Sequence, residues 1–348
     1  MTSTLSSLET KSPDPLHFKR DWFQRQIVEW FRKNKRDLPW RKTSDPYQIW
    51  ISELMCQQTG VATVVPYFEK FIRRFPSVEA LSKASEFEVL HLWQGLGYYQ
   101  RARNLHKASK IIVHELGGRL PATKEELRKI PGIGEYTAGA ILSIAFSIST
   151  PALDGNLIRI YSRFFGEKRP IDDPKNLKQL WARAQGLSKM KSHWVRDFTE
   201  GLMELGALVC RPKSPSCYQC PIRLKCISFM EGLTDQIPQK KKKIKRVKLQ
   251  EWIHLIFENG KIGILEKGAD EKYPDFHRLP FQLKDSAPKA HSFRMKYSVT
   301  HRDFEVFVLR SHPPAQMKIK WVKPNRLDQI LLPAIDRKIL KKEALLSD

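Results

Sequence analysis

Apolar residues recur every three to four positions over most of the first two thirds of the chain, a spacing typical of amphipathic helices. In residues 18–34 the apolar positions are Phe18, Trp22, Ile27, Val28, Trp30 and Phe31. Short segments containing Gly or Pro, such as Asp45-Pro46 and Gly117-Gly118, separate further runs of the same kind. Strand patterns are scarce there. We therefore predict an all-α region over residues 17–231.

A run of basic residues follows the helical region. Residues 240–248, KKKKIKRVK, hold seven basic residues among nine. Like charges at this density repel one another and extend the chain, so we predict a flexible linker over residues 232–250. The linker is either a solubilising tether or a contact to a polyanion.

Beyond the linker the pattern of apolar positions becomes that of strands. Residues 252–257, 262–265 and 304–309 are apolar or alternate in short bursts, and the turn signal Asn259-Gly260 separates the first two. We therefore predict a smaller α+β domain over residues 251–348.

The net charge of the chain indicates which kind of molecule it binds. The chain has 61 Lys and Arg against 37 Asp and Glu, a formal net charge of +24 with a pI near 9.8. This excess indicates a polyanionic partner, with nucleic acid first and ribosomes or an anionic membrane surface as alternatives. No run approaches the roughly 18 apolar residues of a membrane span, and residues 1–15 lack the apolar core of a secretory signal. We expect no membrane insertion and no secretion.

Four of the five cysteines lie within residues 210–226, with the spacing C-x6-C-x2-C-x5-C. Four thiolates in one short loop can hold a tetrahedral metal ion or a cubane cluster. The spacing differs from that of zinc ribbons and of bacterial ferredoxins, although a structural zinc site stays an alternative. Clustered cysteines without a secretory signal indicate a reducing compartment. The predicted ligands are Cys210, Cys217, Cys220 and Cys226.

A glycine-containing turn lies between two predicted helices at residues 130–138, IPGIGEYTA. Gly132 and Gly134 let the backbone turn tightly and approach a ligand closely. The N-terminus of the following helix then offers free N–H groups to one phosphate of a nucleic acid, without sequence preference. The alternative is a plain turn between helices.

Two carboxylates stand in segments that can carry chemistry. Asp154, in Leu153-Asp154-Gly155-Asn156, is either the N-cap of a helix or a carboxylate facing a reacting sugar, and these roles can coexist. Glu53 has apolar neighbours on both sides, so burial with a raised pKa is one interpretation and a solvated helix face is the other. The adjacent Gln57 and Gln58 suit hydrogen bonds to base edges.

Together these motifs resemble the helix-hairpin-helix DNA glycosylases, and within them the MutY adenine glycosylases. The resemblance covers about residues 20–230. It implies a mainly α catalytic region, a six-helix barrel plus an iron–sulfur cluster domain, followed by a Nudix-like α+β domain. The matching segments are Leu38–Arg41, Ser52-Glu53, Gln57–Thr59, Gly95–Tyr99, Arg101–His106, Ile130–Ala138, Leu153–Asn156, Leu202–Ala207 and the four cysteines.

The resemblance also implies a mechanism in which adenine is flipped out of duplex DNA. Protonated Glu53 donates to the purine ring, while ionised Asp154 stabilises positive charge at the sugar, helped by Tyr136 and Asn156. The implied cofactor is a structural [4Fe–4S] cluster on the four cysteines. The implied DNA contacts are Gln57, Gln58, Tyr98, Gly132, Gly134, Thr300 and His301.

One position separates the related families. Where endonuclease III, which removes oxidised pyrimidines and nicks the strand, has a Schiff-base lysine, this chain has Tyr136. Imine formation requires a primary amine, so we predict glycosidic cleavage alone. The alternatives are an endonuclease III-like pyrimidine glycosylase with lyase activity and a DNA-binding protein without catalysis.

The chain departs from the MutY pattern in three places. Phe198-Thr199-Glu200 stands where the family more often has Asn, and this difference leads to no prediction. Cys56 replaces the usual leucine wedge, so Tyr98 is expected to carry more of that role. In the second domain Val299-Thr300-His301 stands where the family has Phe-Ser-His, and the Thr300 hydroxyl could replace the serine that reads 8-oxoguanine. Nudix hydrolysis is not expected, because Pro274-Asp275 stands where Arg-Glu is required.

The expected substrate is therefore double-stranded DNA with adenine opposite 8-oxoguanine or guanine. We expect a monomer. The expected location is the cytoplasm, with the nucleoid, in a bacterium, and the nucleus or mitochondrion in a eukaryote.

Overall fold

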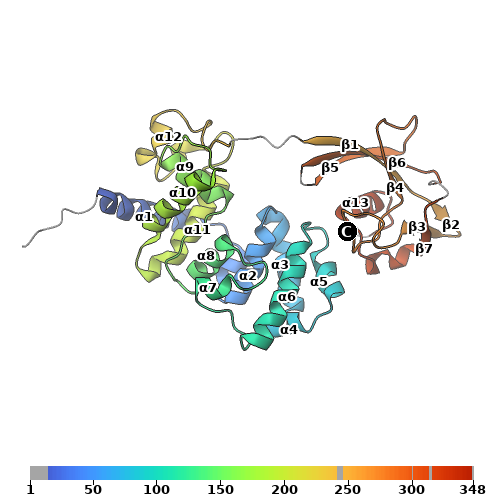
Figure 1. The fold of residues 1–348 in the computed structure, drawn as a ribbon, viewed down its shortest axis with the longest axis horizontal. Coiled ribbons are helices and arrows are strands. Elements are labelled where there is room, and N and C mark those ends of the chain that lie inside the picture. Colours follow the sequence, from blue (N-terminus) through green and yellow to red (C-terminus); the bar gives the residue numbers. More distant parts are fainter. Residues whose placement is uncertain (1–14, 241–245, 300, 313–315, 347–348) are drawn as a thin grey trace, which may run out of the picture. The chain divides into compact units, whose positions relative to one another are not determined.

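The computed structural model describes residues 15–240, 246–299, 301–312 and 316–346 (Figure 1). The chain forms two compact units, each built from two separate segments. Unit 1 comprises Met1–Leu54 with Arg119–Lys241, and unit 2 comprises Met55–Gly118 with Lys242–Asp348. The helical region thus contributes to both units. The boundaries drawn from the sequence, at 17–231, 232–250 and 251–348, stay a prediction.

Unit 1 is helical. Helix α1 packs along α11 and contacts α10, and α11 also packs against α8 and α9. Phe23 and Ile27 of α1 meet Leu157 of α9 and Leu202 of α11 in one buried cluster, which confirms the amphipathic face expected for residues 18–34. The helices are α1 (Pro15–Asn34), α2 (Pro46–Cys56, which ends in unit 2), α7 (Lys124–Leu127), α8 (Glu135–Ile144), α9 (Gly155–Phe164), α10 (Pro174–Ser188), α11 (Ser192–Leu208) and α12 (Ile227–Met230), with 3-10 turns η1 (Pro39–Lys42), η2 (Cys217–Gln219) and η3 (Arg223–Lys225).

A close approach inside unit 1 fixes the entry to α9. A Cβ atom on Gly139 of α8 would lie 2.2 Å from the carbonyl oxygen of Pro151, a distance that real Cβ contacts do not reach. Only glycine at this position lets α8 lie against residues 151–152. The chain then turns into α9, which the Asp154 side chain caps by accepting hydrogen bonds from the N–H groups of Asn156 and Leu157.

The helical part of unit 2 contains four helices, in which α6 packs against α4 and α5, and α3 against α5. Ser85 begins α5 with a capping box, since its hydroxyl accepts from the N–H of Glu88 while the Glu88 carboxylate accepts from the N–H of Ser85. The helices are α3 (Val61–Arg74), α4 (Val78–Ser82), α5 (Glu86–Trp93) and α6 (Gln100–Glu115).

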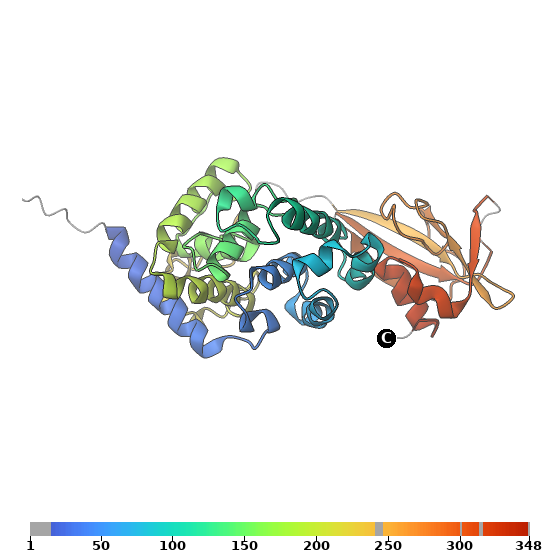
Figure 2. The ribbon, with the colours of Figure 1, turned by 90° about the horizontal axis from the view of Figure 1, so that it is seen from below.

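The rest of unit 2 is a region of two sheets and a helix, which confirms the predicted α+β texture. One sheet has the order β4-β1-β6-β5, with β1 and β6 parallel, and the other has the order β2-β3-β7. Ile335 and Ile339 of helix α13 belong to a buried cluster with residues of both sheets. Figure 2 shows this dark red helix beside the strands. The elements are β1 (Val247–His254), β2 (Phe257–Glu258), β3 (Lys261–Leu265), β4 (Phe281–Lys284), β5 (Phe293–Val299), β6 (Arg302–Leu309), β7 (Ile319–Val322), η4 (Pro324–Gln329) and α13 (Ala334–Lys342).

One predicted strand is wrong. The apolar run 252–257 is the end of β1 and the start of β2, which belong to different sheets. Leu255 and Ile256 are buried at the crossing between the sheets, so burial makes them apolar without their being strand residues. The predicted turn at Asn259-Gly260 is confirmed between β2 and β3, with φ values of 47° and 70°.

A buried ionic cluster joins the elements of the α+β region. The Arg278 guanidinium is fully buried and pairs with Asp336 of α13 at 2.9 Å, with Glu251 of β1 at 3.4 Å, and with Asp270. Removing Arg278 would leave these three buried carboxyl groups without the cation they share, so the guanidinium holds helix and sheet in one arrangement. In the described part of the chain no helix is long and apolar enough to cross a membrane.

Candidate active site

Glu53 and Tyr136 form a hydrogen-bonded pair in unit 1. Glu53 lies near the end of α2 and is 8% exposed, and Tyr136 lies in the first turn of α8. The phenol Oη of Tyr136 donates to Oε2 of Glu53 at 2.6 Å. Burial raises the pKa of Glu53 to about 7, and the charges of Asp154 and Glu200 add to the rise, whereas the Tyr136 hydrogen bond and Arg41 oppose it. The carboxyl is therefore partly protonated at neutral pH.

Asp154 and Asn156 form a second pair at the start of α9. Asp154 Oδ1 accepts from the backbone N–H groups of Asn156 (2.9 Å) and Leu157 (2.8 Å), and Oδ2 accepts from Asn156 Nδ2 at 2.9 Å. Burial raises the pKa of Asp154, while these hydrogen bonds favour its charged form and lower it. Asp154 is thus the helix cap. Its charge also acts on Glu53, so unit 1 brings together all four candidate catalytic residues.

A small cavity opens beside Glu53. Its empty space is about 270 Å³ including open solvent, and it combines an indole, two carboxyl groups and a guanidinium with apolar side chains. The lining residues are Trp40, Arg41, Ile49, Ser52, Glu53, Ile144, Glu200 and Met203. The arrangement places hydrogen-bonding and apolar groups around a proton donor.

Arg41 is held at the cavity by a buried acid. Glu204 on α11 is fully buried and accepts from Arg36 Nη2 at 2.7 Å and from Arg41 Nη2 at 2.8 Å. Burial alone raises the pKa of Glu204, but the two arginines outweigh it and lower that pKa to about 2. Arg41 Nε also lies 3.9 Å from Glu200, whose pKa burial raises. Glu204, charged at neutral pH, therefore fixes Arg41 beside Glu200.

Sequence reasoning missed most of this cavity wall. Trp40 and Arg41 lay in a matching segment without an assigned role, and the segment around Glu200 led to no conclusion. These residues come together only in the folded chain, so no local pattern in the sequence marks them. Burial of Glu200, at 6% exposure beside Glu53, is visible only once α2 and α11 are packed.

The turn before α8 has the geometry expected of a phosphate contact. Gly132 has φ 83°, Gly134 is the N-cap residue of α8, and both are exposed while Ile133 between them is buried. Glu135 places a negative charge in the first turn of α8. The side chain of Glu135 pairs with Lys124 and, at 3.2 Å, with Arg128, so two cations balance its charge beside the turn. Phosphate binding by Gly132 and Gly134 stays a prediction.

The remaining predicted DNA contacts belong to unit 2. Gln57 is half-buried and Gln58 exposed after the end of α2, and Tyr98 is 48% exposed before α6. His301 is exposed at the turn between β5 and β6, whereas Thr300 lies outside the described residues. The roles of all five residues stay predictions.

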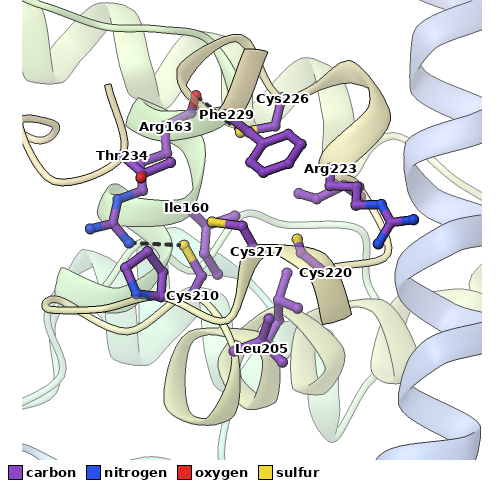
Figure 3. Close-up of a pocket in the computed structure, with 13 residues that line it drawn as sticks. Ile160, Arg163, Leu205, Cys210, Cys217, Cys220, Arg223, Cys226, Phe229 and Thr234 are labelled. Atoms are coloured by element: carbon purple, nitrogen blue, oxygen red, sulfur yellow. Dashed lines mark hydrogen bonds between the residues drawn. The ribbon is translucent and has the colours of Figure 1, made fainter. Parts of the chain in front are cut away.

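The four clustered cysteines line one cavity of unit 1, shown in Figure 3. The space among them is about 380 Å³ including open solvent, and Arg163 Nη1 donates to Cys210 Sγ at 3.4 Å. Burial raises the pKa of Cys220 to about 12 and that of Cys226 to about 11. Within the described ranges, no three Cys, His, Asp or Glu side chains converge closely enough to hold a metal ion.

Comparison with known proteins identifies the class. Residues 51–192 match the model of the HhH-GPD superfamily of base excision DNA repair proteins. A thermostable thymine-DNA glycosylase of known structure is 30% identical with a TM-score of 0.57, covering 63% of this chain and all of that one. An endonuclease III trapped as a covalent DNA intermediate is 20% identical with a TM-score of 0.52, covering 62% of this chain and 98% of that one, which shows the fold alone. The described helices therefore have the fold of a base-excision glycosylase.

A longer match identifies the family. Over 251 residues the chain is 39% identical to the adenine DNA glycosylase of Buchnera aphidicola subsp. Schizaphis graminum, covering 72% of each chain. The chain belongs to the adenine DNA glycosylase family. It is therefore an enzyme of base excision repair, a hydrolase acting on N-glycosyl bonds, and the endonuclease III-like alternative is not favoured.

Proposed function

We propose that this enzyme hydrolyses the N-glycosidic bond of adenine opposite 8-oxoguanine or guanine in duplex DNA and leaves the strand uncut. One observation carries the proposal. Buried Glu53, with a pKa of about 7, shares a hydrogen bond with Tyr136 and opens on a cavity of suitable chemistry. A carboxyl group with this pKa is matched to proton donation at neutral pH.

The cavity beside Glu53 receives the extruded adenine. The indole of Trp40 offers a flat apolar surface, while Glu200 and Arg41 offer an acceptor and a donor to the polar edge of a purine. Protonated Glu53 donates to a ring nitrogen. The base then departs as neutral adenine, a better leaving group than its anion.

Asp154 stabilises the positive charge that develops at the sugar as the bond breaks. Its hydrogen bonds from Asn156 and Leu157 hold the carboxylate in place and favour its charged form. Water then completes the hydrolysis. Tyr136 has no amine, so it cannot form the imine on which strand cleavage by a lyase depends.

Two features support binding to duplex DNA, and we expect the enzyme to bind it as a monomer. The net charge of +24 favours a polyanion, and the exposed turn at Gly132 and Gly134 offers backbone N–H groups to a phosphate. Gln57, Gln58 and Tyr98 enter the base stack. The enzyme acts wherever the genome lies, in the nucleoid of a bacterium or in the nucleus or mitochondrion of a eukaryote.

The α+β region reads the base opposite adenine and has a Nudix-like fold. The exposed position of His301, on the turn between β5 and β6, supports a DNA contact there. The hydroxyl of Thr300, its neighbour in sequence, recognises 8-oxoguanine.

Cys210, Cys217, Cys220 and Cys226 hold a [4Fe–4S] cluster. Four cysteine sulfurs from one short loop line a single cavity, and such a ligand set can hold a cubane of several irons. When bound, the cluster cross-links the loop 210–226. Its role is structural, since acid-catalysed base excision transfers no electron.

Single-turnover cleavage tests the proposal. Four duplexes carry one central A:8-oxoguanine, A:G, A:T or thymine glycol:A pair, and each reaction is divided into samples with and without alkali. We expect breaks at adenine that depend on alkali and form fastest opposite 8-oxoguanine. Breaks at thymine glycol without alkali would refute the proposal, and equal rates on A:8-oxoguanine and A:G would refute the role of Thr300.

A further inference from the structure

Two residues of unit 2 adopt a backbone conformation that is unfavourable for their side chains. Gln58, after α2, has φ 59°, and Tyr98, before α6, has φ 49°. Both lie in the left-handed region, which residues other than glycine adopt only when their surroundings hold them there. Gln58 is exposed and Tyr98 is 48% exposed, so both side chains are presented to solvent.

One guanidinium holds both segments. Arg101, in the first turn of α6, donates from Nη1 to the carbonyl oxygens of Met55 (3.0 Å) and Gln57, and from Nη2 to those of Gly97 (3.1 Å) and Leu96 (3.4 Å). The carbonyls of Gln57 and Gly97 belong to the peptide groups that directly precede the two strained residues. The same side chain therefore fixes both peptide planes from which Gln58 and Tyr98 turn.

The chemistry of the contact suits arginine alone. A planar fork of N–H groups can bond several carbonyls at fixed angles, which a lysine ammonium cannot do. The guanidinium also lies 5.4 Å from the ring centres of Trp93 and Tyr98, where cation–π attraction is effective. Burial lowers the pKa of Arg101 to about 10, so the group stays charged at neutral pH.

We propose that Arg101 is a positioning residue that holds these two segments rigidly together. The linked segments control extrusion of the target adenine and not cleavage of its glycosidic bond. The inference rests on the proposed function, in which Gln57, Gln58 and Tyr98 enter the base stack. Two rigidly linked side chains can keep a base pair open together. Two side chains that move independently relax to separate conformations, and the base pair then closes again.

The test compares adenine that must be extruded with adenine that is already unpaired. Variants Arg101→Met and Arg101→Lys are assayed in single turnover on adenine opposite 8-oxoguanine and on adenine in a one-nucleotide bulge. Arg74→Met is the matched control, because Arg74 also stacks on a ring (Phe75, 5.0 Å) and pairs with Glu88 within unit 2. Thermal melting and iron content of each protein report the fold.

We expect the single-turnover excision rate of both Arg101 variants on the paired substrate to fall by about tenfold to hundredfold. A change of this size corresponds to the free energy of the backbone strain that the variants release. Both should match the wild type on the bulge, and Arg74→Met should match it on both substrates. An equal loss on the two substrates, or no loss on the paired one, would overturn the proposal. Rescue by Arg101→Lys would also overturn it, because the fork geometry would then be irrelevant.

A second readout separates this inference from the proposed function. With 2-aminopurine at the target position, extrusion raises fluorescence whether or not a bond is cut. A wild type that releases no adenine from either substrate refutes the proposed function, yet fluorescence still reports on Arg101. Equal fluorescence changes in the wild type and Arg101→Met would then refute the positioning role by themselves.

Discussion

The Tyr136 phenol donates a 2.6 Å hydrogen bond to the carboxyl group of Glu53, which is only 8% exposed. The hydrogen bond favours the charged carboxylate, whereas burial and the nearby Asp154 and Glu200 favour the neutral acid. Burial wins, and the pKa of Glu53 rises to about 7. The ability of Glu53 to donate a proton at neutral pH thus depends on its buried position in α2, beside Tyr136 of α8.

Replacing Glu53 by Gln should abolish most of the activity. The amide keeps the shape of the side chain but cannot donate the proton, so the single-turnover rate should fall by about a hundredfold to ten-thousandfold. Glu167→Gln is the control, since Glu167 is also buried in unit 1 but pairs with Arg169 outside the cavity. Excision by Glu53→Gln at the wild-type rate would remove Glu53 from the mechanism.

The rate should depend on pH through the same group. Because the acid form is the active one, the single-turnover rate of the wild type should be flat below pH 7 and fall about tenfold per pH unit well above it. Tyr136→Phe removes a hydrogen bond to the charged form, so the falling limb should move to higher pH by about one unit. A limb centred near pH 4.5, or one that Tyr136→Phe leaves in place, would contradict the assignment.

The raised pKa also predicts a stability gradient. Between pH 4.5 and 7 the unfolded chain loses the Glu53 proton and the folded chain keeps it, so the free energy of unfolding falls as pH rises through this window. The loss is about 3 kcal/mol, at roughly 1.4 kcal/mol per pKa unit. Denaturation at pH 5 and pH 8 should show Glu53→Gln gaining stability relative to the wild type. Parallel pH dependences would show that Glu53 is ionised throughout.

Asp154 can be separated from its structural role. Asn is as good an N-cap as Asp, so Asp154→Asn should keep α9 and melt within a few degrees of the wild type. Without the negative charge, the excision rate should fall by about a hundredfold or more. Asp173→Asn is the matched control, because Asp173 caps α10 by accepting from the N–H of Lys175 at 2.9 Å, away from the site. Equal activity of the two variants would reduce Asp154 to a cap.

The local features of this site could be predicted from the sequence, whereas its cavity could not. Apolar spacing predicted α1, and boundary chemistry identified Asp154 as a cap, because both depend on near neighbours in the chain. The role of Glu200 depends on packing α11 against α2, 147 residues away in the chain from Glu53, a relationship that no local pattern contains. The prediction of one strand over residues 252–257 was wrong for a related reason. Apolar residues are favoured both in a buried strand and in a buried connection between sheets, so the pattern does not distinguish them.

Iron content should distinguish the cluster cysteines from the fifth one. Cys217 lines the sulfur cavity, so Cys217→Ser should lower bound iron and the absorption near roughly 400 nm that iron bound to thiolates produces. Cys56 lies at the end of α2 outside that cavity, so Cys56→Ser should keep both signals. Zinc in place of iron in the wild type would overturn the cluster, and equal iron in the two variants would remove Cys217 from the ligand set. If the cluster cross-links residues 210–226 as proposed, limited proteolysis of Cys217→Ser should cut first within this loop, whereas Cys56→Ser should resist cleavage there like the wild type.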